Sequence, residues 1–148
     1  MSESLVIEAV RKTVTIDCTV EEAFRVFTSE ATSWWPSQSH SIHGSVSEIV
    51  FEPRAGGRVY EVAESGEHGH WATVLEWEPP NRLLLAWNIL ERAGDATEVE
   101  VRFLPAEAGT LVQLEHRGWE NVELEGAAKR ENYDSGWDVV LGRYVDRL

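Results

Sequence analysis

The feature that most constrains the fold is the last stretch of the chain, residues 127–148, whose apolar side chains recur at the spacing of an α-helix. The apolar stripe consists of Tyr133, Trp137, Val140, Leu141, Tyr144, Val145 and Leu148. This spacing predicts one amphipathic helix of about six turns, with its charged face in water. Gly136 lies beside Trp137 in mid-helix, where a missing side chain lets a backbone or a ligand come close. A single helix cannot bury such a stripe, so the preceding residues must supply an apolar surface.

The residues before this helix mostly alternate between apolar and polar side chains, as strands with one buried face do. The first strand is expected over residues 5–16, and the helix over 19–28 begins with a capping box of Thr19 and Glu22. A second, very short helix over 31–35 ends at Pro36, and a polar loop covers 37–45. Six further strands, joined by turns, are expected over 46–51, 58–62, 70–77, 83–89, 97–103 and 110–116.

Hairpin connections between these strands imply an antiparallel sheet. The predicted fold is therefore α+β: a curved antiparallel sheet of about seven strands is wrapped round a long C-terminal helix, with two short helices after the first strand. We expect a single domain over residues 1–148, with a cavity between the sheet and the helix. The 37–45 loop is expected at the mouth of that cavity.

Charge and cysteine content exclude several function classes. A net charge of −13 and a pI of about 4.7 argue against binding to nucleic acids or to anionic membranes, which require Lys/Arg patches. One cysteine, Cys18, excludes an internal disulfide and fits a reducing compartment. With no signal-peptide pattern and no run of 18 apolar residues, we expect a cytoplasmic protein.

Several motifs resemble one family. They are WWP at 34–36, FEPRAGG at 51–57, VLEWEPP at 74–80 and GW at 136–137. Together they resemble the bacterial branch of the activator homologues of the ninety-kilodalton heat-shock protein ATPase, within the START-like (SRPBCC, birch pollen allergen-like) superfamily. The resemblance covers residues 8–147 and implies the helix-grip fold. It specifies function poorly, because this superfamily includes ligand carriers, cyclases and co-chaperone domains.

Seven of the 14 aromatic residues are tryptophans, which is an unusual share. It suggests that several rings line an apolar pocket for a planar or apolar ligand. The alternative is that these rings are large core residues that fill the space under the helix. The pocket role is favoured for Trp34, Trp35, Trp87 and Trp137. The full set of expected ligand-binding residues is Trp34, Trp35, His40, Phe51, Trp71, Trp87, His116, Trp119, Tyr133 and Trp137.

The histidines supply the candidate polar groups. His116 shares a strand face with Val112 and Leu114, so it is either a pocket-facing anchor or a core histidine with satisfied hydrogen bonds. His40 lies in the loop at the cavity mouth and is a candidate for its rim.

The remaining polar pairs carry weaker signals. The pairs His68/His70 and His40/His43 have spacings that metals permit, but no acidic or cysteine ligand accompanies them, so no metal is expected. Glu61, near the glycine-rich turn, is expected to form structural ion pairs rather than to present a carboxylate to the cavity.

Three function classes follow. The first is binding of a small apolar or aromatic molecule in the cavity, without a bound cofactor. The second is a cyclase- or dehydratase-like enzyme with His116 or Tyr133 as acid/base. The third is a chaperone-interacting module, which is less favoured because the eukaryotic co-chaperone carries a further N-terminal domain that is not expected here. The sequence leaves open whether the protein forms a homodimer.

Overall fold

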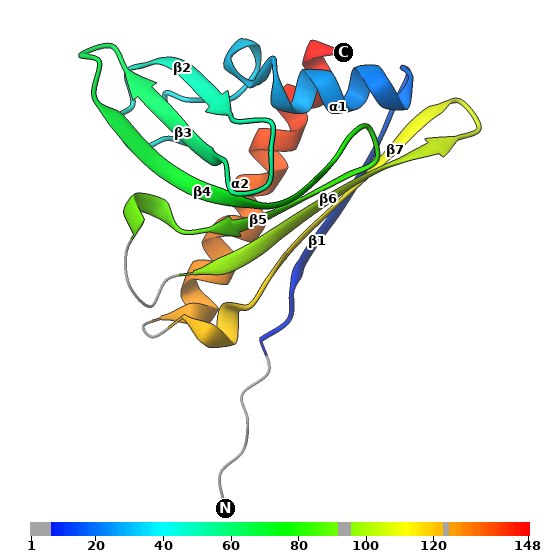
Figure 1. The fold of residues 1–148 in the computed structure, drawn as a ribbon. Coiled ribbons are helices and arrows are strands. Elements are labelled where there is room, and N and C mark those ends of the chain that lie inside the picture. The colour runs from blue at the N-terminus through cyan, green and yellow to red at the C-terminus, as the bar shows by residue number, and fades with distance from the viewer. Residues whose placement is uncertain (1–6, 92–95, 123–124) are drawn as a thin grey trace, which may run out of the picture.

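A seven-stranded antiparallel sheet curls around one long helix in the computed structural model, which describes residues 7–91, 96–122 and 125–148 (Figure 1). The strands are β1 (Val10–Ile16), β2 (Val46–Phe51), β3 (Arg58–Ala63), β4 (His68–Glu78), β5 (Arg82–Trp87), β6 (Thr97–Ala106) and β7 (Gly109–Arg117). The helices are α1 (Val20–Thr28) and α2 (Gly126–Arg147), and the short 3₁₀ helices are η1 (Ala31–Ser33), η2 (Ile89–Glu91) and η3 (Trp119–Asn121). The predicted helix-grip architecture is confirmed.

Strand order in the sheet is β1-β7-β6-β5-β4-β3-β2, so the first strand pairs with the last and the others follow as hairpins. The β1–β7 register sets Val10 opposite His116 and Val14 opposite Val112. The described part of the first strand begins at Val10 rather than at residue 5, and residues 5 and 6 lie outside the described residues. The strand expected over 83–89 ends at Trp87, because Leu90 takes a left-handed φ of 57° in η2.

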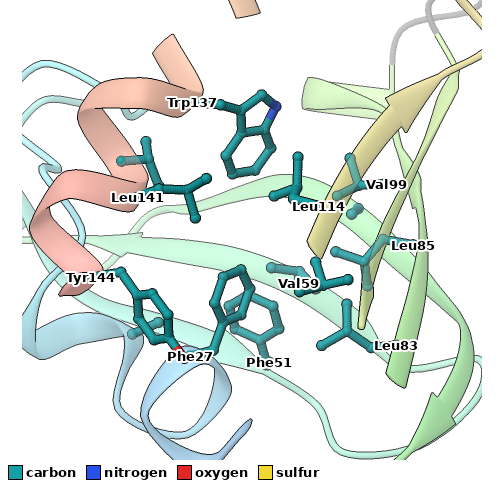
Figure 2. Close-up of a cluster of buried hydrophobic side chains, with 14 of the residues drawn as sticks. Phe27, Phe51, Val59, Leu83, Leu85, Val99, Leu114, Trp137, Leu141 and Tyr144 are labelled. Atoms are coloured by element: carbon teal, nitrogen blue, oxygen red, sulfur yellow. The ribbon is translucent and has the colours of Figure 1, made fainter. Parts of the chain in front are cut away.

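The core lies between α2 and the concave face of the sheet. Figure 2 shows Trp137 and Leu141 pointing from α2 toward Leu114 of β7, and Tyr144 lying beside Phe27. The three α2 residues are all 3% exposed or less, which confirms the centre of the predicted apolar stripe. The prediction is wrong at the C-terminal end of the stripe, because Leu148 is 37% exposed and lies just beyond the last residue of α2. None of the helices within the described residues is long and apolar enough to cross a membrane.

Helix α1 covers one end of the concave face. The Thr19 side chain accepts a hydrogen bond from the Glu22 amide at 3.1 Å, the first half of the predicted capping box. Phe24 and Phe27 point into the core, and the Tyr144 hydroxyl donates to the carbonyl of Ala23 at 2.7 Å. This bond ties the C-terminal end of α2 to α1.

Candidate ligand-binding pocket

A pocket of about 430 Å³ opens between α2, β4, β5, η2 and residues 37–45, which we call the entrance segment. Its lining consists of Trp35, Ser39, His40, Ser41, Ile42, Trp71, Trp87, Ile89, Leu90, Asn132, Tyr133, Gly136, Trp137 and Val140. No Asp, Glu, Lys or Arg occurs among these lining residues, which all belong to the described part of the chain. Four residues of the entrance segment, Ser39, His40, Ser41 and Ile42, are among the lining residues, and its position at the mouth stays a prediction.

Four indole rings border the pocket in a closed circuit. Ring centroids lie 4.8 Å apart for Trp35 and Trp71, 5.9 Å for Trp71 and Trp87, 5.8 Å for Trp87 and Trp137, and 6.0 Å for Trp137 and Trp35. The four tryptophans come from the segment after η1, from β4, from β5 and from α2. The fold thus brings together residues up to about a hundred positions apart, which is why sequence spacing alone could not show the circuit.

Each of these indoles is fixed by a hydrogen bond from its ring N–H. Trp35 donates to the carbonyl of His40 at 2.7 Å, and Trp71 donates to a carboxylate oxygen of Glu61 at 2.7 Å. Trp87 donates to the Tyr133 hydroxyl at 3.0 Å. A buried indole needs a partner for its N–H, and these bonds leave the apolar ring surfaces as the pocket wall.

His116 is held behind this wall rather than in it. It is fully buried, with its ring 4.2 Å from that of Trp119. Its Nδ1 accepts from Trp137 Nε1 at 3.0 Å, and its Nε2 lies 2.7 Å from Thr97 Oγ1. Because an indole can only donate, the neutral imidazole carries its proton on Nε2 and donates to Thr97. Burial lowers the pKa of His116 to about 3, so the ring is uncharged at neutral pH.

His40 lies at the rim, where the entrance segment meets α2. Its Nδ1 is 2.6 Å from Ser39 Oγ, which fixes the ring. A Cβ added to Gly136 would lie 3.7 Å and 3.8 Å from two ring atoms of His40. An added side-chain carbon would thus be in ordinary van der Waals contact with His40, and the expected close approach of a backbone or ligand at Gly136 stays a prediction. Asn132, one helical turn earlier, lines the pocket on the same side.

Glu61 was expected to form structural ion pairs near the glycine-rich turn, and it does pair with His43, whose Nδ1 lies 2.7 Å from Glu61 Oε2. Its environment differs from the expected solvated one, because it points inward from β3 and is fully buried. Alternation gave a signal, since Glu61 stands between the inward-facing Val59 and Ala63. A buried carboxylate needs several donors, and the entrance segment supplies most of them.

The structure sorts the ten predicted site residues into two groups. Those that line the pocket are Trp35, His40, Trp71, Trp87, Tyr133 and Trp137. Those that lie outside the lining are Trp34, Phe51, His116 and Trp119. Trp34 and Phe51 both pack on Phe27, with ring centroids at 5.5 Å and 6.3 Å. A ligand contact by any of the ten stays a prediction.

The histidines considered for metal binding contact other side chains. His68 stacks on Tyr60 with ring centroids 4.8 Å apart, whereas the His70 ring accepts from Arg58 at 3.3 Å. Among the described residues, no three His, Cys, Asp or Glu side chains gather closely enough to hold a metal ion.

Comparison with known proteins adds a family and several similar structures. Residues 17–148 match the family described as Activator of Hsp90 ATPase homolog 1-like protein. An anthrahydroquino-gamma-pyrone synthase, Txn09, solved in complex with SUM, is 32% identical, with a TM-score of 0.66 over 97% of this chain and 98% of that chain. The self-sacrificing resistance protein CalC from Micromonospora echinospora is 26% identical, with a TM-score of 0.69 over 94% of this chain and 92% of that chain. The Aha1 dimer from Colwellia psychrerythraea is 17% identical, with a TM-score of 0.67 over 96% of each chain, a similarity of fold alone. No curated protein matches the chain.

Proposed function

The chain belongs to the Activator of Hsp90 ATPase homolog 1-like family, and we propose that it binds a small planar aromatic molecule in the pocket beneath α2. The observation that carries this proposal is the circuit of four fixed indoles around a pocket without Asp, Glu, Lys or Arg in its lining. Offset and edge-to-face contacts between aromatic rings contribute about 0.5–1.5 kcal/mol each beyond the burial of area. Four such walls favour a flat ring system over a flexible chain.

The size and charge of the pocket narrow the ligand class. A volume of about 430 Å³ is near the small end of the range for ligand pockets, which suits two or three fused rings. An anionic ligand would lose its hydration without gaining a cationic partner, and the net charge of −13 would repel it. The ligand is therefore neutral, with hydroxyl or carbonyl groups that face His40, Asn132 and Tyr133.

One relative supports the same ligand class. The name of the synthase Txn09 describes an oxygenated polycyclic aromatic skeleton, and that protein was solved in complex with SUM. At 32% identity over 97% of this chain, it is similar to this protein over the whole domain. This similarity favours a planar, oxygen-bearing ligand over a lipid chain.

Binding is tested with two neutral planar alcohols, 2-naphthalenemethanol and 9-anthracenemethanol, by calorimetry and tryptophan quenching. Trp87→Leu should weaken binding about tenfold, which corresponds to the loss of about 1.4 kcal/mol of ring contact. Trp77→Leu is the matched control, because Trp77 packs on Phe24 at 5.1 Å and does not line the pocket. Failure of both alcohols to saturate the protein, or equal weakening by both substitutions, would overturn the proposal.

A second candidate is a cyclase-like enzyme that uses the same pocket, and its support is the similarity to a synthase. Of the two groups considered as acid/base, Tyr133 lines the pocket, whereas His116 has both ring nitrogens engaged behind it. Tyr133→Phe should then lower kcat at constant KM for a substrate whose mass changes on incubation. Unchanged mass across a panel of hydroxylated polycyclic substrates would leave binding as the function.

A chaperone partner and a homodimer stay predictions. The Aha1 dimer is similar to this chain in fold only, at 17% identity. Light scattering during size-exclusion chromatography gives the mass in solution and decides between monomer and dimer.

A further inference from the structure

The buried carboxylate of Glu61 joins three parts of the pocket wall. Its Oε1 accepts from the amide of Ile42 at 2.7 Å and from the indole N–H of Trp71 at 2.7 Å. Its Oε2 accepts from the amide of His43 at 2.8 Å and pairs with the ring Nδ1 of His43 at 2.7 Å. The carboxylate thus holds the entrance segment against β3 and β4.

These four bonds occupy the lone-pair sites of the carboxylate, so Glu61 has no free site with which to act as a base. Burial alone would raise the pKa of Glu61, but the bonds from Ile42, His43 and Trp71 outweigh it and lower that pKa. Ile42 and Trp71 both line the pocket. Glu61 therefore acts on a ligand through the residues that it positions.

His43 extends this arrangement outward. Its Nδ1 faces Glu61 of β3, and its Nε2 lies 2.9 Å from a carboxylate oxygen of Glu67, in the turn before β4. Gly69 of β4 leaves room for the ring, since a Cβ there would lie 3.1 Å from His43 Cε1. Ionised carboxylates only accept, so both ring nitrogens must carry protons for both bonds to form. The geometry requires an imidazolium between two carboxylates.

We propose that Glu61 and His43 are positioning residues that set the rate of ligand exchange: with His43 doubly protonated, the bonds to Glu61 and Glu67 keep the entrance segment seated over the pocket. Loss of one ring proton removes the Glu67 bond, because Nε2 then presents a lone pair to a carboxylate. The part of the entrance segment around His43 is then released from the turn before β4, and exchange of the ligand becomes faster. This inference rests on the proposed function, since it concerns the same pocket.

The sign of the pH dependence follows from the charges around the ring. The hydrogen bonds to Glu61 and then to Glu67 raise the pKa of His43 above its ordinary value of 6.5. The contribution of the His43–Glu67 bond to closure is complete below pH 6.5 and is lost as the pH rises through the raised pKa of His43. Ligand exchange should therefore accelerate on the alkaline side of neutrality.

The first experiment uses the ligand-free protein. Nitrogen-15 NMR should show both ring nitrogens of His43 protonated at pH 6, with one proton lost at a midpoint above pH 6.5. Hydrogen exchange of the Ile42 and His43 amides and of the Trp71 indole N–H, corrected for intrinsic base catalysis, should rise at the same midpoint. A neutral ring at pH 6, or protection that does not change through the midpoint, would overturn the inference whatever the protein binds.

The second experiment measures the dissociation rate of 2-naphthalenemethanol, whose hydroxyl does not ionise in this range, by stopped flow at several pH values. The rate should rise about twofold to fivefold through the midpoint, the scale of one exposed ion pair. Glu67→Ala should release the probe fast at every pH. Glu67→Gln should stay slow at high pH, because its amide can donate to a neutral Nε2.

Glu64→Gln is the matched control, since it removes the same charge from the same turn and should keep the wild-type profile. A pH-independent rate that is equal in the wild type and in Glu67→Ala would refute the positioning role while leaving the binding function intact. Conversely, absence of probe binding would overturn the binding function, and the ligand-free measurements would still decide the role of His43.

Discussion

The indole nitrogen of Trp137 on α2 donates a hydrogen bond to Nδ1 of His116 on β7 across 3.0 Å. The bond is buried, and the other ring nitrogen of His116 lies 2.7 Å from Thr97 Oγ1 on β6. One chain of polar atoms therefore crosses the core from the helix to two neighbouring strands. Because a buried acceptor without a donor is costly, this chain fixes the rotation of α2 above the sheet.

Trp137→Phe keeps a ring in the core but removes the donor to His116. The free energy of unfolding should fall by about 1–3 kcal/mol, the cost of leaving a buried acceptor unsatisfied. Urea denaturation measures this loss. Trp77→Phe, at a half-buried position on β4, should cost less than about 1 kcal/mol. Equal losses in the two variants would mean that the hydrogen bond does not fix the helix.

His116 should make the protein less stable on mild acidification. Its pKa is about 3 in the folded state against 6.5 in its ordinary state, so below pH 6.5 the unfolded chain binds a proton that the folded chain does not. Stability should fall toward low pH by up to about 1.4 kcal/mol per pH unit. Comparing urea denaturation at pH 6 and pH 5 for the wild type and His116→Gln isolates this contribution, because most carboxylates stay ionised there. The same loss in both proteins would contradict the assigned protonation state.

Substitutions at Gly136 should separate helix stability from binding. Gly136→Ala meets His40 only at ordinary contact distance, so it should stabilise the helix by about 0.5–1 kcal/mol. Gly136→Leu should fill the pocket and weaken 2-naphthalenemethanol binding about tenfold, a loss of about 1.4 kcal/mol. At Gly142 an added Cβ would meet nothing within 4 Å, so Gly142→Leu is the control that should bind normally. Normal binding by Gly136→Leu would place the ligand elsewhere.

Glu100 should matter for stability and not for binding, because it lies on the outer face of the sheet. Burial opposes its ionisation, but bonds from Arg117, Arg82 and Arg102 prevail and lower the pKa of Glu100 to about 2. Its side chain is 7% exposed, against 46% for Glu98. Glu100→Gln should therefore cost about 1–3 kcal/mol, and Glu98→Gln less than about 1 kcal/mol. Reduced affinity for 2-naphthalenemethanol in Glu100→Gln would show that the two faces of the sheet are coupled.

Alternation and helical spacing predicted most of the fold, because each buried face repeats a simple pattern along the chain. Val112, Leu114 and His116 do face inward as expected, and Trp137 and Tyr144 are buried. Alternation along a strand predicts which face of the sheet a residue lies on, but not which side chains pack over it. His116 is covered by rings from α2 and η3, so it faces the core and not the pocket.

The rest of the pocket and its surroundings were harder to predict. Asn132 could have been found, since it lies one helical turn before Gly136 on the same face. Leu90 could not, because its left-handed backbone follows no periodic pattern. Glu61 was placed near a turn by the sequence, whereas its role depends on amides that reach it from Ile42 and His43, some 18 or 19 residues earlier.

The sheet order also has a consequence for biosynthesis. Val10 pairs with His116, and α2, which covers the concave face, is synthesised after all seven strands. The nascent sheet therefore presents its apolar inner surface on the ribosome until α2 has emerged. Such long-range pairing slows folding and prolongs the lifetime of intermediates that are prone to aggregate. Translation that stalls before α2 would release a polypeptide prone to aggregation, so holding chaperones would be needed most during that interval.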